Sequence, residues 1–486
     1  MATSVRTTYE TVIGLEVHVQ LLTATKIFCS CSTRFGNPPN SNVCPVCLGL
    51  PGALPVLNRK AVEFAVRAAM ALECRINETS IFARKNYFYP DLPKGYQISQ
   101  YDKPLAEFGA IQVLSATGSK TIGITRVHLE EDAGKSLHDG FPDSSDSTAI
   151  DLNRSGVPLI EIVSEPDISS PDEAYEYLTR LKEIILYTGV SDCNMEEGSL
   201  RCDANISVRR AGQEEFGTKT EVKNVNSFRF IREALEYEVQ RHIEVIESGG
   251  KIIQETRLYN SNEGKTYGMR SKEQAHDYRY FPEPDLLPLV VDEKYQAEIR
   301  RTLPELPEAR RKRMTGDYGI SEKDAVVLTT TKSFADQFET AAKAAKNPKR
   351  VANLVQSELQ GRLNAKGIDI DQSPISMQGV AMSADLVESG AISGKMLKDL
   401  YDLSFERGKD FPVVYEEEGR PEQSRDTSAL EKIIDELIAA NPQQVEQYRA
   451  GKKTMIGFFV GQVMKASKGQ GNPQMINELL AKKLES

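Results

Sequence analysis

Tryptophan is absent from this chain of 486 residues, which removes a common stacking residue but leaves 18 Tyr and 17 Phe. Long apolar runs are missing too: no stretch approaches the roughly 20 apolar residues of a membrane-spanning helix. The N-terminus lacks the apolar segment of a secretory signal and is too short for a transit peptide. Cysteine occurs only seven times, which does not suggest a disulfide scaffold, so we expect the reducing cytoplasm as the compartment.

Two common catalytic motifs are also missing. Gly134-Lys135-Ser136 imitates the end of a Walker A loop, but Leu129 stands where its first glycine belongs. Gly264-Lys265-Thr266 fails in the same way, with Tyr259 at that position. The chain has no Gly-x-Ser-x-Gly elbow and no Gly/Ser-rich amidase run, and Ala follows the initial Met. We therefore expect no covalent acyl-enzyme on this chain, and any nucleotide site must use a metal with scattered cations.

Positive charge is in the minority. The chain has 70 acidic and 60 basic residues, a formal charge of −10, so a surface that binds nucleic acid everywhere is excluded. Local basic patches remain compatible with this balance. Hydrophobic residues make up 40% and charged residues 27%, an ordinary composition with ample core. The length predicts about two to four domains.

The hydrophobic pattern predicts an α+β fold. Residues 12–21 alternate strictly, with Glu16 and His18 on the polar side of a strand, and residues 122–129, 159–163 and 200–208 look similar. Long helical patterns lie between these runs. They begin near Asn58, at the cap Ser170 before Pro171, and near Ser227. Strands mixed with helices without regular β-α-β spacing favour α+β over a doubly wound sheet.

Proline marks the predicted boundaries. A Pro-rich stretch at residues 284–307 separates the strand-rich part from a part with helical patterning. Residues 411–423 contain two prolines and a glycine and are predicted to form a second linker. The last residues, about 65, then form a small helical unit.

Four of the cysteines are close together in the sequence. Cys29 and Cys31 are followed, after twelve residues, by Cys44 and Cys47, in a segment rich in Gly, Pro and Asn. Four thiolates at this spacing suit tetrahedral Zn²⁺ and leave no open coordination position, so the site would be structural. The alternative is four unrelated thiols in a turn-rich segment.

Acidic residues and histidines suggest a second metal site. Glu16 and His18 share a strand face, Glu130 and Glu131 follow His128, and a further glutamate, at position 161, stands between two isoleucines. A carboxylate in such an apolar run is costly to bury unless it is paired or binds a metal. Oxygen ligands suit Mg²⁺, and a histidine ligand would also admit Mn²⁺. Separate surface acids and a hydrogen-bonded histidine are the alternative that the sequence leaves open.

Seven longer blocks carry a family resemblance. They are residues 10–18, 84–91, 94–100, 128–135, 195–206, 277–285 and 457–468. Together they closely resemble the B subunit of the glutamine-dependent aspartyl/glutamyl-tRNA amidotransferases (GatB), collinearly over essentially the whole chain. The resemblance implies a cradle domain of glutamine-synthetase-like α+β fold over residues 1–292. An all-α helical domain over 293–408 and a YqeY-like, tRNA-binding tail domain over 409–486 would follow.

The resemblance also implies an activity. The family uses ATP to phosphorylate the side-chain carboxylate of Glu-tRNA(Gln) or Asp-tRNA(Asn), and ammonia then converts the product to Gln-tRNA(Gln) or Asn-tRNA(Asn). The amidase of the complex, its A subunit, supplies the ammonia from glutamine through a tunnel, and a small C subunit completes the heterotrimer. This division of labour would explain the missing nucleophile. A non-catalytic, zinc-containing tRNA-binding scaffold is the alternative.

Site residues follow from the same resemblance. It places the catalytic Mg²⁺ (or Mn²⁺) site on Glu16, His18, Glu131 and Glu161, with Glu130 as a neighbour. Strand parity, by contrast, groups Glu130 with His128. Weaker candidates for lining the substrate pocket or the tunnel are Lys85, Tyr87, Arg201 and Asp203. The cysteine site would be a feature of the scaffold and take no part in catalysis.

The C-terminal segment reverses the sign of the charge. Residues 441–486 hold seven bases and three acids, a net charge of +4. Lys452, Lys453, Lys465 and Lys468 flank an apolar helical run and are predicted to contact tRNA phosphates. A solvated helix face is the alternative.

Overall fold

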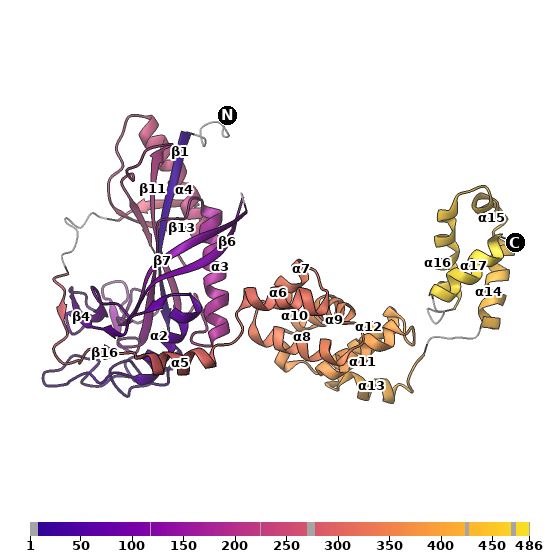
Figure 1. Cartoon of the computed structure of the whole chain (residues 1–486), viewed down its shortest axis with the longest axis horizontal. Helices are drawn as coiled ribbons and strands as arrows, with labels where there is room; N and C mark the ends of the chain where they lie inside the picture. Colours follow the sequence, from indigo (N-terminus) through magenta and orange to yellow (C-terminus); the bar gives the residue numbers. More distant parts are fainter. Residues whose placement is uncertain are drawn as a thin grey trace. The chain divides into compact units, whose positions relative to one another are not determined.

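A computed structural model describes residues 8–485 apart from 117, 224, 270–277, 423–426 and 468–472. The chain forms two compact units, Met1–Leu306 and Pro307–Ser486. The first combines a large sheet with helices and the second is helical (Figure 1). This confirms the predicted α+β class with a helical C-terminal part. None of the described helices has both the length and the apolar character that a membrane crossing needs.

A nine-stranded sheet forms the framework of the first unit. Its order is β14-β13-β12-β11-β1-β10-β7-β6-β2, and neighbours pair antiparallel except β12 with β13. The strands are β1 (Tyr9–Gln20), β2 (Arg75–Ile76), β6 (Ala106–Ser115), β7 (Gly118–Glu131), β10 (Pro158–Ser164), β11 (Leu200–Arg210), β12 (Thr220–Lys223), β13 (Thr256–Asn260) and β14 (Lys265–Gly268). The four runs predicted as strands correspond to β1, β7, β10 and β11, and the first run extends one residue past the end of β1. Their adjacency brings residues far apart in sequence onto one face.

Helices cover the apolar face of this sheet. The alternation in β1 buries Leu15, Val17 and Val19 in one core together with residues of α2 (Arg59–Ala71), α3 (Pro171–Thr188) and α4 (Phe228–Glu247). Figure 1 shows α3 running alongside the long strands. The predicted caps are confirmed, because the side chains of Asn58, Ser170 and Ser227 accept backbone N–H groups of the first turns. The opposite face keeps the polar residues.

Short strands complete the first unit. A three-stranded sheet joins β4 (Phe82–Asn86) to β5 (Tyr96–Gln100) and β15 (Phe281–Pro282). Two small pairs are β3 (Thr79–Ser80) with β16 (Leu289–Val290), and β8 (Lys135–Leu137) with β9 (Ala149–Asp151). Helix α5 (Glu293–Thr302) buries Ile299 in the same core, so the first unit extends beyond residue 292.

The second unit contains two separate hydrophobic clusters. The first holds buried residues between Met314 and Tyr415, and the second holds buried residues between Leu430 and Leu484. These clusters support our proposal of a helical domain and a tail domain. The α-helices are α6 (Pro307–Tyr318), α7 (Glu322–Leu328), α8 (Lys332–Ala344), α9 (Pro348–Leu354), α10 (Gln360–Lys366), α11 (Met377–Glu388), α12 (Gly394–Arg407), α13 (Phe411–Glu417), α14 (Thr427–Ala440), α15 (Pro442–Arg449), α16 (Ile456–Ala466) and α17 (Pro473–Glu485).

One expected linker is wrong in part. Residues 411–417 form α13, whose first turn contains Pro412 and is capped by Asp410. Phe411 and Val414 are fully buried in the first helical cluster. A proline in the first turn favours a helix start, and the prediction took it for a sign of a linker.

Candidate active site and cysteine site

Three neighbouring strands align the central residues of the site. Glu161 on β10 pairs in register with His18 on β1 and with His128 on β7. His18 pairs on its other side with Arg201 of β11. Residues directly opposite one another share a face, so these four side chains form a row on the polar face of the sheet.

His18, Glu130 and Glu161 converge. Each offers a ligand atom, and these atoms all lie within 4.8 Å of one another. The Nε2 atom of His18 is 3.3 Å from Oε2 of Glu161 and 3.9 Å from Oε1 of Glu130. Both carboxylates are buried, whereas the His18 side chain is 21% exposed. We call this set the carboxylate–histidine cluster.

Glu130, not Glu131, lies beside His18 and Glu161. Successive residues of β7 point to opposite faces, and Glu131 turns away to form an ion pair with Lys94. Its Oε1 also accepts the backbone N–H of Ile98 at 2.8 Å. The geometry therefore favours Glu130 as a ligand, as strand parity does. The family resemblance had suggested Glu131 instead.

The histidines control the charge of the cluster. Burial by itself raises the pKa of Glu161, but His128 and His18 outweigh it and hold that pKa well below its ordinary value. Burial lowers the pKa of His128, and Glu161 and Glu130 reverse this and raise it to about 9. The pKa of His18 is also raised, because Glu161 and Glu130 outweigh its burial. Two anionic carboxylates are thus kept in a buried site.

Glu16 and Asp203 extend the acidic face along β1 and β11, where they pair in register. The Oε1 atom of Glu16 accepts a hydrogen bond from Asn205 at 3.0 Å. Burial, with the negative charge of Glu161 second, raises the pKa of Glu16. Asp203 is 2.9 Å from Nζ of Lys223. Glu16 therefore adjoins the cluster without belonging to the group of ligand atoms that converges.

Arg201 is held by a buried aspartate, Asp132, to which sequence analysis had assigned no role. Asp132 Oδ2 accepts hydrogen bonds from Arg201 at 2.9 Å and from Gln20 at 2.7 Å, and Arg154 Nε lies 3.7 Å away. Asp132 follows Glu130 and Glu131 directly, and its position at the end of β7 was the available signal. These contacts orient two guanidinium groups beside the cluster.

Lys85 approaches the cluster from β4. Its Nζ lies 4.9 Å from the ring centre of Tyr278 and 5.9 Å from that of Tyr87. Burial lowers the pKa of Lys85, but Glu130, Tyr280 and Glu161 outweigh it, so that pKa is raised. The Tyr87 hydroxyl donates to Gln97 at 3.0 Å. Lys85 thus lies near both carboxylates of the cluster, and Tyr87 lies near Glu130.

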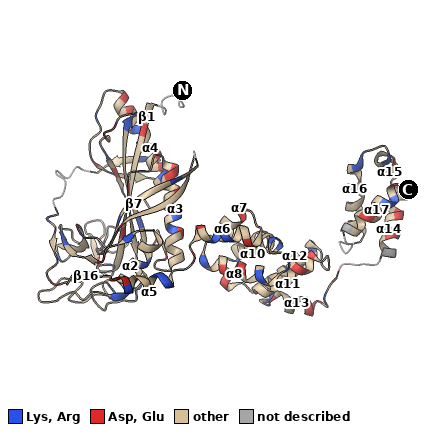
Figure 2. Cartoon of the chain, viewed as in Figure 1, with Lys and Arg blue, Asp and Glu red and all other residues tan. Residues whose placement is uncertain are grey.

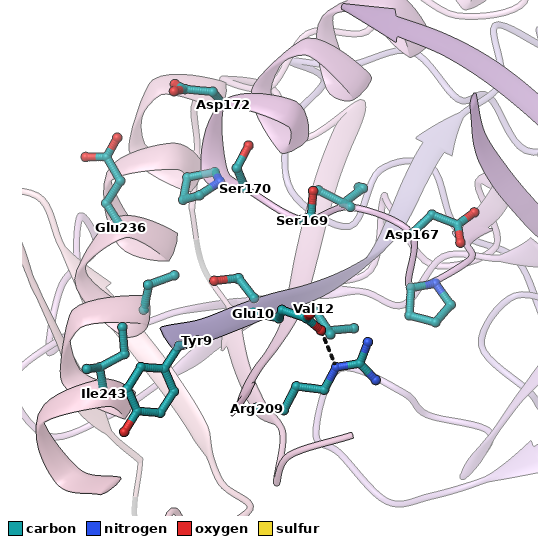
Figure 3. A pocket seen from close by; sticks show the side chains of 15 residues that line it. Tyr9, Glu10, Val12, Asp167, Ser169, Ser170, Asp172, Arg209, Glu236 and Ile243 are labelled. Carbon is teal, nitrogen blue, oxygen red and sulfur yellow. Dashed lines mark hydrogen bonds and ion pairs between the residues drawn. The ribbon is translucent and has the colours of Figure 1, made fainter. Parts of the chain in front are cut away.

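A cavity of about 1050 Å³ adjoins this row of side chains. Arg201 and Asp203 line it. The lining also holds four cations and four acids to which sequence analysis had assigned no role: Arg34, Lys135, Arg154, Lys223, Asp151, Asp192, Glu196 and Glu197. A second pocket, of about 480 Å³, has mostly acidic charged residues, and its Arg209 is paired with Glu10 at 3.0 Å (Figure 3). The first cavity therefore has several cations that suit phosphate groups, next to an equal number of acids, whereas Arg209 is the one cation among the described residues that line the second pocket.

The four predicted zinc ligands converge. The Sγ atoms of Cys29, Cys31, Cys44 and Cys47 all lie within 4.8 Å of one another. A hydrogen bond from Cys29, aided by the backbone N–H of Cys44 and by Lys26, lowers the pKa of Cys47 to about 4. The Nζ atom of Lys26, a fully buried lysine, lies 3.5 Å from Cys47 Sγ. Four thiols that converge beside a buried cation fit Zn²⁺.

The donor chemistry of the carboxylate–histidine cluster fits a hard divalent cation. Two buried carboxylates and one partly exposed imidazole supply oxygen and nitrogen ligands, and the exposed side leaves room for water or a substrate oxygen. Concentrated negative charge in a buried place is costly without a counter-ion. The residues present therefore fit Mg²⁺ or Mn²⁺.

The tail lysines lie around α15 and α16. Lys452 and Lys465 are exposed and form no ion pair with another described residue, whereas Lys453 is 3.1 Å from Glu485. Lys468 lies outside the described residues. Both signs of charge occur on the helices of the second unit (Figure 2). Among the described residues of the tail, the predicted phosphate contacts therefore depend on exposed lysines without an ion pair, Lys452 and Lys465.

The fold and the site define a class: an α+β catalytic domain with a buried carboxylate–histidine cluster, followed by helical domains. Residues 11–297 match the family model of the GatB/GatE catalytic domain, and residues 336–484 match that of the GatB domain. The chain belongs to the GatB family.

Full-length relatives agree with these matches. A protein of Carboxydothermus hydrogenoformans is 56% identical over 98% of this chain and 99% of its own length. Proteins of Syntrophotalea carbinolica and Geotalea uraniireducens are 55% and 56% identical, over 98% of this chain and 98% and 99% of their own lengths. All three are named as the B subunit of an aspartyl/glutamyl-tRNA(Asn/Gln) amidotransferase.

Proposed function

We propose that this chain is the B subunit of an ATP-dependent, glutamine-hydrolysing aminoacyl-tRNA amidotransferase. It activates the side-chain carboxylate of Glu-tRNA(Gln) or Asp-tRNA(Asn), and ammonia then gives Gln-tRNA(Gln) or Asn-tRNA(Asn). The names of its full-length relatives support this assignment. The observation that carries it is the carboxylate–histidine cluster beside a cavity whose lining includes Arg154, Arg201 and Lys223.

The chemistry requires activation by ATP. A carboxylate does not react with ammonia, because oxide is a poor leaving group. Attack of the carboxylate on the terminal phosphate of ATP gives an acyl phosphate and ADP. Ammonia then attacks the acyl carbon, phosphate leaves, and loss of a proton gives the amide. Both anions must be brought together, so positioning and charge neutralisation dominate the catalysis.

The carboxylate–histidine cluster would hold the catalytic Mg²⁺ or Mn²⁺ through His18, Glu130 and Glu161, with Glu16 adjoining. Such an ion neutralises charge on the phosphates and on the attacking carboxylate. The family match places Glu131 among the ligands, whereas its ion pair with Lys94 favours another role.

The cations of the cavity would bind the phosphates. Arg201 and Arg154 are held in place by Asp132, and Lys223 is held by Asp203. Guanidinium groups fixed in this way donate hydrogen bonds to phosphate without first having to be ordered. Lys85 adds positive charge on the side of the two carboxylates, and Tyr87 lines the approach to them.

The partners follow from the division of the reaction. We propose that an amidase, the A subunit of the complex, releases ammonia from glutamine and that a small C subunit completes a heterotrimer. Zinc on Cys29, Cys31, Cys44 and Cys47 would hold the loop that they share. The tail lysines Lys452, Lys453, Lys465 and Lys468 would contact tRNA phosphates.

Formation of ADP tests this function. We expect the three-subunit complex to release ADP only when Glu-tRNA(Gln) or Asp-tRNA(Asn) is present, and His18→Ala to abolish that release while tRNA affinity stays nearly unchanged. A scaffold without catalytic residues would make amide at the same rate with His18→Ala, and that result would refute the proposal.

A further inference from the structure

His128 contacts both carboxylates of the cluster from its buried side. Its Nε2 atom lies 3.5 Å from Oε2 of Glu161 and 3.6 Å from Oε2 of Glu130. The side chain is 3% exposed, against 21% for His18. The Nδ1 atom is buried without a hydrogen-bond partner, so the contacts of the ring with the cluster are those of Nε2. His128 therefore lies behind the carboxylates, away from the exposed side where a substrate would enter.

The two oxygens of Glu130 have different surroundings. Oε2 accepts a hydrogen bond from the Ser99 hydroxyl at 2.9 Å and lies beside His128. Oε1 is the oxygen that faces His18, at 3.9 Å. Residues of β5 and β7 thus fix the orientation of the Glu130 carboxylate. The oxygen that faces His18 and the proposed metal position is Oε1.

We propose that His128 and Ser99 form a buried clamp that presents Glu130 and Glu161 to a divalent cation, with His128 as a positioning residue. This inference rests on the proposed metal site. Two carboxylates a few ångströms apart repel each other, and free rotation would let them separate. The Nε2 atom of His128, which lies within 3.6 Å of both carboxylates and is fixed in the core of the sheet, opposes that separation. Groups that orient metal ligands in this way typically change affinity about 10–100-fold when removed.

The unpartnered Nδ1 atom makes the idea testable by a conservative change. A glutamine at position 128 can place an amide N–H near the position of Nε2, and no hydrogen bond is lost at Nδ1 because none exists there. Phenylalanine keeps the ring and removes both nitrogens. His128→Gln and His128→Phe therefore separate the donor function from packing.

The experiment is Mn²⁺ binding, followed by electron paramagnetic resonance, on the full-length chain loaded with zinc. We expect His128→Phe to raise the Kd for Mn²⁺ about 10–100-fold and Ser99→Ala to raise it about tenfold. His128→Gln should stay within about threefold of wild type, since the donor is restored. His138→Gln is the matched control, because His138 contacts Thr148 outside the cluster and should leave Kd unchanged.

Nitrogen hyperfine coupling identifies the direct ligand. We expect coupling from one coordinated nitrogen in wild type, its loss in His18→Ala, and its retention in His128→Gln. Loss of the coupling in His128→Gln would make His128 a ligand and overturn the proposal, as would wild-type affinity in both His128→Phe and Ser99→Ala. If His128→Phe does not fold by circular dichroism, Ser99→Ala alone decides. Failure of wild type to bind Mn²⁺ would refute the metal site itself, a different result from failure of the clamp.

Discussion

Glu161 illustrates how single residues create this site. It stands between Ile160 and Ile162, which face the core, and its own carboxylate is 9% exposed. An isolated buried carboxylate would be protonated, but the two histidines stabilise its charged form. The two histidines therefore offset the cost of burying the Glu161 carboxylate. A bound metal ion would supply part of this compensating positive charge.

Exchange of Glu130 for glutamine should weaken metal binding far more than the same change at Glu131. Glu130→Gln removes a ligand charge, so we expect the Kd for Mn²⁺ to rise about a hundredfold or more. Glu131→Gln breaks the ion pair with Lys94 and should change that Kd less than about threefold. Titration with Mn²⁺ compares the two, and equal losses would contradict the ligand set proposed here.

Strand parity and the family resemblance pointed to different members of this pair, and the contacts in the structure favour the one on the face of His128. His128 and Glu130 share a face because side chains alternate along a strand, and the family resemblance alone pointed to Glu131. The contacts of Ser99, Asp132 and Lys94 were out of reach, because they depend on how β5, β7 and β11 pack. The spacing of residues along the chain does not show which distant strands contact one another.

At the scale of elements, the cysteine loop packs on residues 150–155, for example through the Asn42 N–H, which donates to Asn153 Oδ1 at 2.7 Å. Cys44 and Cys47 lie in one turn, with the Cys44 N–H donating to Cys47 Sγ at 3.2 Å, and Cys29 and Cys31 come from the preceding segment. We expect a bound Zn²⁺ to order this segment further, beyond the hydrogen bonds that it makes with residues 150–155.

We expect one zinc per chain by elemental analysis. Cys47→Ser should lose it and increase hydrogen–deuterium exchange around the four cysteines. Cys74→Ala is the matched control, because Cys74 lies in the core away from the other thiols and should keep the metal. Full zinc content in Cys47→Ser would show that these thiols are unrelated.

A buried ion cluster stabilises α6 and α8. Glu339 is 2.8 Å from Arg310 Nε and 2.6 Å from Arg313 Nη2. Burial raises the pKa of Glu339, but Arg313 and Arg310 outweigh it and lower that pKa to about 2. Because the pKa of Glu339 is lower in the folded than in the unfolded chain, its carboxylate stabilises the fold at pH values above the unfolded pKa. This stabilisation is lost as the pH falls toward about 2.

Glu339→Gln should therefore lower the free energy of unfolding at neutral pH by about 2 kcal/mol. This is less than the loss of a fully buried ion pair would cost, because Arg313 is partly exposed. The difference from wild type should shrink as pH falls from about 4.5 toward 2. Urea unfolding followed by circular dichroism measures this, with exposed Glu308→Gln on α6 as control. A difference that grows in acid would contradict the assigned pKa direction.

Elements with strong local signals were predictable. The caps of α2, α3 and α4 are Asn58, Ser170 and Ser227, each readable from the chain. Helix α13 was not, since Pro412 and a following glycine also fit a linker, and only burial of Phe411 selects the helix. Strands of two residues, such as β2 and β15, have no period to detect.

Charge is distributed unevenly over the whole molecule. The net charge of −10 gives no hint of an RNA partner, whereas residues 441–486 have a net charge of +4. Part of the acidic excess lies in the carboxylate–histidine cluster and its neighbours, where a metal site needs it. The sequence alone predicted this separation, but not which tail lysines are already paired.

The double variant Lys452→Ala/Lys465→Ala should weaken tRNA binding and reduce its salt dependence. Each lost phosphate contact lowers the slope of log K against log salt by roughly one. Filter binding at several salt concentrations gives that slope. The exposed pair Lys60 and Glu63 in the first unit offers the control Lys60→Ala, which should leave the slope unchanged. An unchanged slope in the double variant would mean a solvated helix face.

The most direct test of the central claim follows oxygen atoms through the reaction. The three-subunit complex is given tRNA carrying glutamate labelled with oxygen-18 in its side-chain carboxylate, together with ATP and glutamine. The account predicts one labelled oxygen in inorganic phosphate for each amide formed, and neither product with Glu161→Gln at unchanged tRNA affinity. Amide formation with unlabelled phosphate, or full activity in Glu161→Gln, would contradict it.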